Sequence, residues 1–258
     1  MSLLPREHGA YGQIAFPLIA AFAVAGPSTA GTLIAVATVA GFLAHEPALI
    51  LLGLRGVRAK RDMRPRAVQW LGIWAVIGAA AGIAAVMTMD RAARPTLLVP
   101  LVPALLLALA TARGKEKSWC GETAAAVAFS AVALPVAVAA GAAWSTAAAI
   151  VIPFALLFVS STLAVRVVIL RVRGGGDPVA AAITRRAALS IAVGGAAVLA
   201  MATAIAALPV STLGAAAPGL ITAAALAVRP PGPSRLRAVG WTLVAVSVLT
   251  TALVIIMA

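Results

Sequence analysis

The sequence predicts an all-α integral membrane protein of about nine transmembrane helices, with its N-terminus in the cytoplasm and its C-terminus outside. Hydrophobic residues make up 63% of the 258 residues and charged residues only 10%, whereas about a quarter of a soluble domain is charged. The apolar runs consist mainly of Ala, Val, Leu and Ile, which is typical of closely packed helices and not of alternating barrel strands. Basic residues gather between these runs, as they do in the short cytoplasmic loops of membrane proteins.

Each transmembrane element is predicted from an apolar window between polar interruptions. Crossing about 30 Å of hydrocarbon takes about 20 helical residues. The windows, in chain order, are 6–25, 32–54, 67–89, 96–112, 123–142, 146–170, 186–208, 212–228 and 236–257. Because such windows continue to the last residues, we expect the first to be a retained helix and not a cleaved signal peptide. Residues 1–258 are expected to form a single helical transmembrane domain.

The connections between the windows support this count. Alternate connections, at 26–31, 141–145 and 209–214, carry no charge, and the others are basic. Of the 20 Lys and Arg residues, only Arg91 and Arg94 fall in connections predicted to lie outside. A wrong number of helices would scatter basic residues over both faces, so the distribution favours nine helices.

The net charge of +13 is therefore explained by membrane topology. A nucleic-acid partner would require a continuous basic surface on a soluble domain, and the sequence offers none. Cys120 is the only cysteine, which excludes a disulfide or a CxxC motif within one chain. The partners expected from composition are membrane lipids, and the oligomeric state is left open.

A polar segment at 5–13 opens the first window. Pro5 suits the start of a helix, and Glu7 lies near the positive end of the helix dipole. Together with His8 and Gln13, these residues form either an interfacial cap or part of a functional site, and both interpretations stay open here.

A second candidate is the sequence His45-Glu46-Pro47 inside the window 32–54. Glu46 precedes Arg55 by a distance of about 13 Å along a helix. Ionisable residues within a membrane helix are costly, so they usually mark a functional site. The alternative is a structural ion pair or hydrogen bond that involves no substrate.

Three arginines are candidates for holding an anionic group. Arg55 and Arg58 are spaced to face the same cavity as Glu46. Arg166 lies inside an apolar window, where it needs an acidic partner or an anionic ligand. A pocket of this kind suits a phosphate or carboxylate head with an apolar tail.

Metal binding is an open question at this stage. His and Glu are suitable ligands for zinc or iron, and Glu122 could supplement one ligand from each of the two pairs. Neighbouring residues on a helix point about 100° apart, however, so Glu7 with His8, or His45 with Glu46, would seldom face one ion together. No cofactor is identified from the sequence.

The segment 5–13, the His45-Glu46-Pro47 step and the basic stretch 55–66 together resemble the bacterial YwiC-like family of membrane proteins. This resemblance spans most of the chain. It implies a multi-pass protein of the cell membrane, which in these organisms is the bacterial inner membrane.

A more distant likeness is architectural. Nine helices with polar segments after the second, fourth and sixth are similar to the UbiA-type prenyltransferases, which hold magnesium on a prenyl diphosphate with Asp-rich motifs. Here His45 and Glu46 lie near the position of the first motif, and the segment after the sixth window offers only Asp177 beside its arginines. The likeness therefore implies an isoprenoid or lipid-like substrate but not magnesium.

These observations predict a membrane-embedded enzyme, a transferase in the UbiA-like interpretation, that acts on a lipophilic substrate with an anionic head at a cytoplasm-facing pocket. Proton transfer or substrate polarisation is assigned to Glu7, His8, His45 and Glu46. Substrate binding is assigned to Arg55, Arg58, Arg166, Gln13 and Glu122. The competing hypothesis is a proton- or ion-coupled transporter in which the same His and Glu form a relay.

Overall fold

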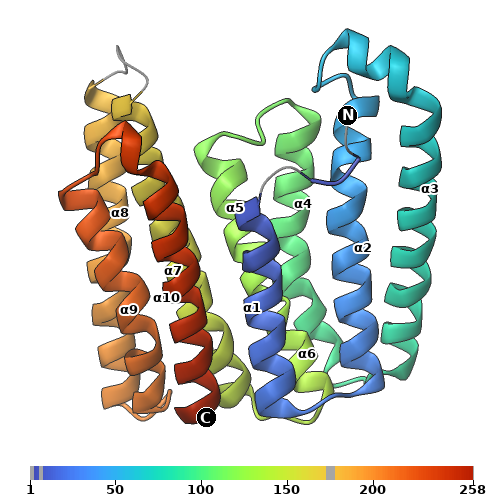
Figure 1. The fold of residues 1–258 in the computed structure, drawn as a ribbon. Helices are drawn as coiled ribbons and strands as arrows, with labels where there is room; N and C mark the ends of the chain where they lie inside the picture. Colours follow the sequence, from blue (N-terminus) through green and yellow to red (C-terminus); the bar gives the residue numbers. More distant parts are fainter. Residues whose placement is uncertain (1–2, 6–7, 173–177, 258) are drawn as a thin grey trace.

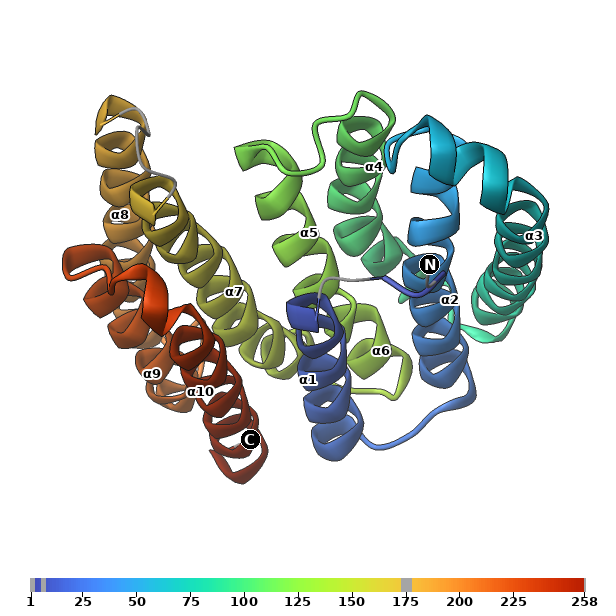
Figure 2. The ribbon, with the colours of Figure 1, turned by 45° about the horizontal axis from the view of Figure 1, so that its top comes forward.

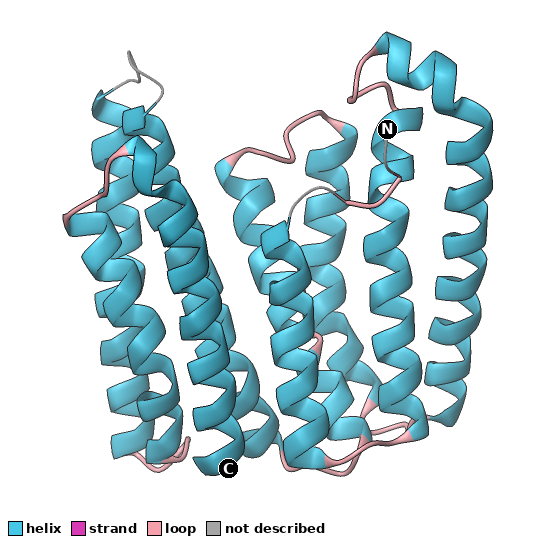
Figure 3. Ribbon diagram, viewed as in Figure 1, coloured by secondary structure: helices cyan, strands magenta, loops and turns pink. Residues whose placement is uncertain are grey.

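The computed structural model describes residues 3–5, 8–172 and 178–257, and this part of the chain contains helices and no strands (Figures 1 and 3). The helices are α1 His8–Ala25, α2 Thr29–Leu51, α3 Val57–Thr88, α4 Leu98–Ala112, α5 Trp119–Ala131, α6 Ala133–Ala139, α7 Trp144–Val172, α8 Pro178–Ala204, α9 Val210–Val228 and α10 Leu236–Met257. Two short 3₁₀ turns, η1 Arg94–Leu97 and η2 Pro233–Arg235, precede α4 and α10.

Length and composition of these helices confirm a polytopic membrane protein. In the described residues, eight helical segments are long and apolar enough to cross a membrane, with η1 and α4 forming one segment and α5 and α6 another. The remaining helix, α1, is a shorter apolar helix. Many large apolar side chains, such as Val76, Leu105 and Val198, are exposed on the outside of the bundle, as expected of a surface that faces lipid.

Two helices begin well before their predicted windows. α3 begins at Val57 and not at 67, and α8, which covers the seventh window, begins at Pro178 and not at 186. The added turns of α3 are rich in Lys and Arg and those of α8 are rich in Ala, all of which are good helix formers, so each helix continues beyond its predicted window. The fifth window is broken at Val132, because Pro135 has no N–H for the Ala131 carbonyl one turn earlier.

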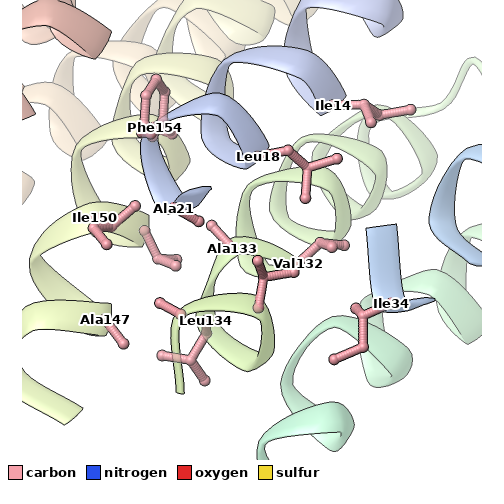
Figure 4. Close-up of a cluster of buried hydrophobic side chains, with 14 of the residues drawn as sticks. Ile14, Leu18, Ala21, Ile34, Val132, Ala133, Leu134, Ala147, Ile150 and Phe154 are labelled. Carbon is pink, nitrogen blue, oxygen red and sulfur yellow. The ribbon is translucent and has the colours of Figure 1, made fainter. Parts of the chain in front are cut away.

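The helices form two groups, α1–α6 and α7–α10, which lie side by side (Figures 1 and 2). The largest buried cluster joins the groups, and its side chains come mainly from α1, α2, α5, α6 and α7. Figure 4 shows Leu18 and Ala21 of α1 near Val132 and Ala133, with Ile150 and Phe154 of α7 beside them. Smaller clusters hold α7, α8 and α9 together.

The bundle has one strongly charged end. The α2–α3, α4–α5 and α9–α10 junctions lie at this end, called the charged end below, and the C-terminus lies at the opposite end (Figure 1). Arg91 and Arg94 follow α3 at the opposite end, as the loop tally predicts. The charged end is the one predicted to be cytoplasmic.

Candidate functional site

Glu46 lies in the last turns of α2 and is fully buried. It pairs with Arg55, whose Nε donates to Glu46 Oε1 at 2.9 Å and whose Nη2 donates to Oε2 at 2.6 Å. A two-point arginine–carboxylate contact is among the strongest hydrogen-bonded pairs in proteins. Each oxygen of the Glu46 side chain therefore accepts an N–H group of Arg55.

The turn after α2 explains how Arg55 reaches back to Glu46. The Leu54 N–H donates to the Leu49 carbonyl, and the Gly53 N–H donates to the Ile50 carbonyl. Gly53 adopts a φ of +80°, a left-handed conformation that ends helices and favours glycine. The chain thus reverses within a few residues, which brings Arg55 beside the helix that it has just left.

Glu116 joins this pair from the loop between α4 and α5. Its Oε1 lies 3.7 Å from Arg55 Nη1, and its Oε2 lies 3.3 Å from His45 Nε2. Ser118 caps α5 by accepting a hydrogen bond from the Gly121 N–H, which orders the loop beside Glu116. His45, Glu46, Arg55 and Glu116 are called the charged cluster below.

The charged cluster contains an acceptor that lacks a well-directed donor. Among the described residues, Glu116 Oε2 is buried without a hydrogen-bond partner, although His45 Nε2 lies 3.3 Å away. We interpret this approach as a charge contact that is not aligned as a hydrogen bond. A histidine and a carboxylate are the types of side chain that serve as general acid and base in enzymes.

A second ion pair links the two helix groups at the charged end. Arg166 of α7 donates from Nη1 to Glu122 Oε2 of α5 at 2.8 Å and to the Lys117 carbonyl at 2.9 Å. The sequence predicted that Arg166 needs an acidic partner or an anionic ligand, and Glu122 is the acidic partner. Arg166 therefore fastens α7 to the loop that carries Glu116.

Other predicted site residues are placed elsewhere. Arg58 lies in the first turn of α3, where its side chain is 91% exposed and 3.7 Å from Asp62, away from Glu46. Gln13 lies on α1 and is half-buried. Glu7 lies outside the described residues, as does the side chain of His8, which is the first residue of α1.

Glu116 is the residue that the sequence-based assignment missed. A lone acid in a basic loop is usually a solvated charge, so the sequence pattern gives Glu116 no role. The available signal was its position after α4, at the end where His45 and Glu46 were also predicted. In the described chain, no three His, Cys, Asp or Glu side chains gather as metal ligands.

The charged cluster lies entirely in the part of the chain that matches a known family. The family model described as YwiC-like protein matches residues 4–137, just over half of the 258 residues. The chain belongs to the YwiC-like family. The matched range contains His45, Glu46, Arg55 and Glu116, and the Arg166 side of the second ion pair lies beyond it.

No curated protein and no solved structure matches this YwiC-like protein. The architectural likeness to UbiA-type prenyltransferases therefore stays a prediction.

The Arg166–Glu122 pair leads to a testable expectation about how the helix groups are held together. Arg166→Glu places two carboxylates side by side, so we expect a lower thermal unfolding midpoint. Adding Glu122→Arg should restore part of the loss, because the charges attract again while the hydrogen bond to the Lys117 carbonyl stays absent. The pair is about a third exposed, so its coupling energy should be about 1 kcal/mol or less. A double variant less stable than both single variants would contradict this arrangement.

Proposed function

We propose that this YwiC-like protein is a membrane-embedded enzyme that acts on an isoprenoid or other lipid-like substrate with an anionic head at the charged end. The observation that carries the proposal is the buried Glu46–Arg55 pair with Glu116 and His45 attached to it. Burying such a network is costly, and groups held in this way often do chemical work in membrane proteins.

The residues of the charged cluster suit different tasks. Glu116 Oε2 needs a donor, and His45 Nε2 lies 3.3 Å from it. These two side chains are the acid and base of the proposed reaction. Both oxygens of Glu46 accept hydrogen bonds from Arg55, so the proposed role of Glu46 is to position the arginine that contacts Glu116.

Basic side chains around the charged cluster suit an anionic head. Lys115 and Lys117 flank Glu116 and are exposed at the charged end. Arg166 uses Nη1 for its hydrogen bonds to Glu122 and to the Lys117 carbonyl, and a guanidinium has five N–H donors in all. A head group bound at this rim would leave its apolar tail between helices, where lipid chains belong.

The distribution of buried charge favours an enzyme over a transporter. In the described part of the chain, Glu46 is the one charged residue among the fully buried ones, and the other buried polar residues are Ser and Thr. A proton-coupled transporter usually carries ionisable groups along its path, whereas here they gather at one end. His45 contacts Glu116, Glu116 contacts Arg55, and Arg55 contacts Glu46. This series of adjacent ionisable side chains supports a proton- or ion-coupled transporter as the second candidate function.

Mass spectrometry of lipids that copurify with the protein tests the proposal. We expect the wild type to carry an apolar-tailed anion that the His45→Ala, Glu46→Ala and Glu116→Gln variants lose, because each change disrupts the charged cluster. Asp62→Asn is the matched control, since Asp62 is an exposed carboxylate at the same end. An identical lipid profile in all five proteins would count against the enzyme, and proton flux in liposomes would then test transport.

A further inference from the structure

A small hollow lies at the opposite end of the bundle, between the first turns of α7 and α9 and the last turns of α10. Its volume is about 60 Å³. The residues that line it include Thr146, Ser211 and Thr212, which carry hydroxyl groups, and the apolar residues Ile150 and Val254. The hollow shares no residue with the charged cluster.

The side chain of Thr212 brings to this hollow a buried hydroxyl group that needs a hydrogen-bond partner. Its side chain is only 2% exposed, and Oγ1 has no hydrogen-bond partner among the described residues. Some buried helical threonines donate to the carbonyl four residues earlier, as Thr184 does to Ala180, whereas in the described part of the chain Thr111 and Thr250 resemble Thr212 in having no such partner. Thr212 is the third residue of α9, so the carbonyl four residues earlier belongs to Leu208, before the helix begins.

A buried hydroxyl without a hydrogen-bond partner destabilises the folded protein. An oxygen atom of a bound molecule can accept the hydrogen bond that the Thr212 hydroxyl lacks. The positive end of the α9 dipole adds to the preference for such an acceptor. None of the described residues that line the hollow is Lys or Arg, which disfavours a multiply charged group such as a phosphate.

We infer that the hollow binds the carbonyl or carboxyl oxygen of an acyl chain. Thr212 donates to this oxygen, Ser211 and Thr146 lie beside it, and the first carbons of the chain pack on Ile150 and Val254. The volume admits the head and only a few carbons, so the rest of the chain lies in the surrounding bilayer. A free fatty acid and the ester group of a phospholipid share this chemistry.

Photochemical labelling in lipid nanodiscs tests the inference. Two probes carry a diazirine a few carbons from the carbonyl, one on a free fatty acid and one on a phosphatidylcholine acyl chain. After illumination, labelled peptides are mapped by mass spectrometry. We expect adducts on the starts of α7 and α9 and the end of α10, from whichever probe matches the natural source.

Two substitutions at Thr212 identify the role of the hydroxyl. Thr212→Val keeps the shape and removes the donor, so labelling should fall severalfold. Thr212→Ser keeps the donor, so labelling should persist. Labelling by neither probe, or equal labelling of wild type and Thr212→Val, would overturn the inference.

Thermal unfolding with dodecanoate provides a second measurement for the fatty-acid source. We expect this probe to raise the midpoint of the wild type and to leave Thr212→Val unchanged. If Thr212→Val is more stable than the wild type with and without dodecanoate, and neither probe labels the hollow, the hydroxyl is simply unsatisfied or hydrated and the acyl site does not exist. Because the hollow lies far from the charged cluster, none of these outcomes depends on the proposed enzyme activity.

Discussion

Glu46→Ala should lower the free energy of unfolding by about 3 to 5 kcal/mol, the usual cost of removing one partner from a buried ion pair. Glu46 is fully buried, and Arg55 is only 17% exposed. Without Glu46, the arginine keeps its charge but loses two short hydrogen bonds. Chemical unfolding in mixed detergent micelles measures the change.

Arg55→Ala combined with Glu46→Ala should recover part of this loss, because no unbalanced charge is then left in the bundle. The coupling energy from this double-mutant cycle should exceed about 1 kcal/mol. The Arg58–Asp62 pair is the matched control, since both side chains are largely exposed and such pairs contribute about 0.2 to 1 kcal/mol. Equal coupling in the two cycles would mean that burial does not strengthen the Glu46–Arg55 pair.

Gly121→Ala should disturb the charged cluster without changing any of its residues. A Cβ at Gly121 would collide with the carbonyl oxygen of Glu116 and lie 2.8 Å from that of Lys115. These are backbone atoms, so the α4–α5 loop has to move and carries Glu116 away from His45. Overpacking of this kind costs about 1 to 3 kcal/mol.

The lipid profile of Gly121→Ala should therefore match that of Glu116→Gln, and its thermal midpoint should fall. Gly72→Ala and Gly82→Ala are the controls, because a Cβ at either position on α3 meets nothing within 4 Å. Alanine stabilises a helix relative to glycine by about 0.5 to 1 kcal/mol, so these controls should keep or raise the midpoint. A Gly121→Ala protein with unchanged stability and lipids would show that the loop is not tightly packed at Glu116.

Part of the site could be predicted from sequence. His45 and Glu46 stand out because ionisable residues inside an apolar window need a physical reason to be there. Arg166 stands out for the same reason, and the structure supplies Glu122 as its partner. Glu116 could not be identified in this way, because a charged side chain in a loop has little free-energy cost wherever solvent reaches it.

Arg55 and Arg58 illustrate where spacing stops being informative. Their separation by three residues predicts one shared face if the helix continues. Instead α2 ends at Leu51 and α3 begins at Val57, so the two arginines belong to different elements. Arg55 turns inward to Glu46, and Arg58 points outward toward Asp62.

The sequence by itself determined the class of the protein, the approximate number of helices and the gathering of charge at one end. These properties depend on local hydropathy and on where Lys and Arg interrupt it, because burial in lipid acts on each segment separately. Only the tertiary structure decided which charges meet. The contact of Glu116 with His45 and Arg55, and of Arg166 with Glu122, depends on how helices distant in sequence pack together, and helices of similar apolar composition can pack in many ways that hydropathy does not distinguish.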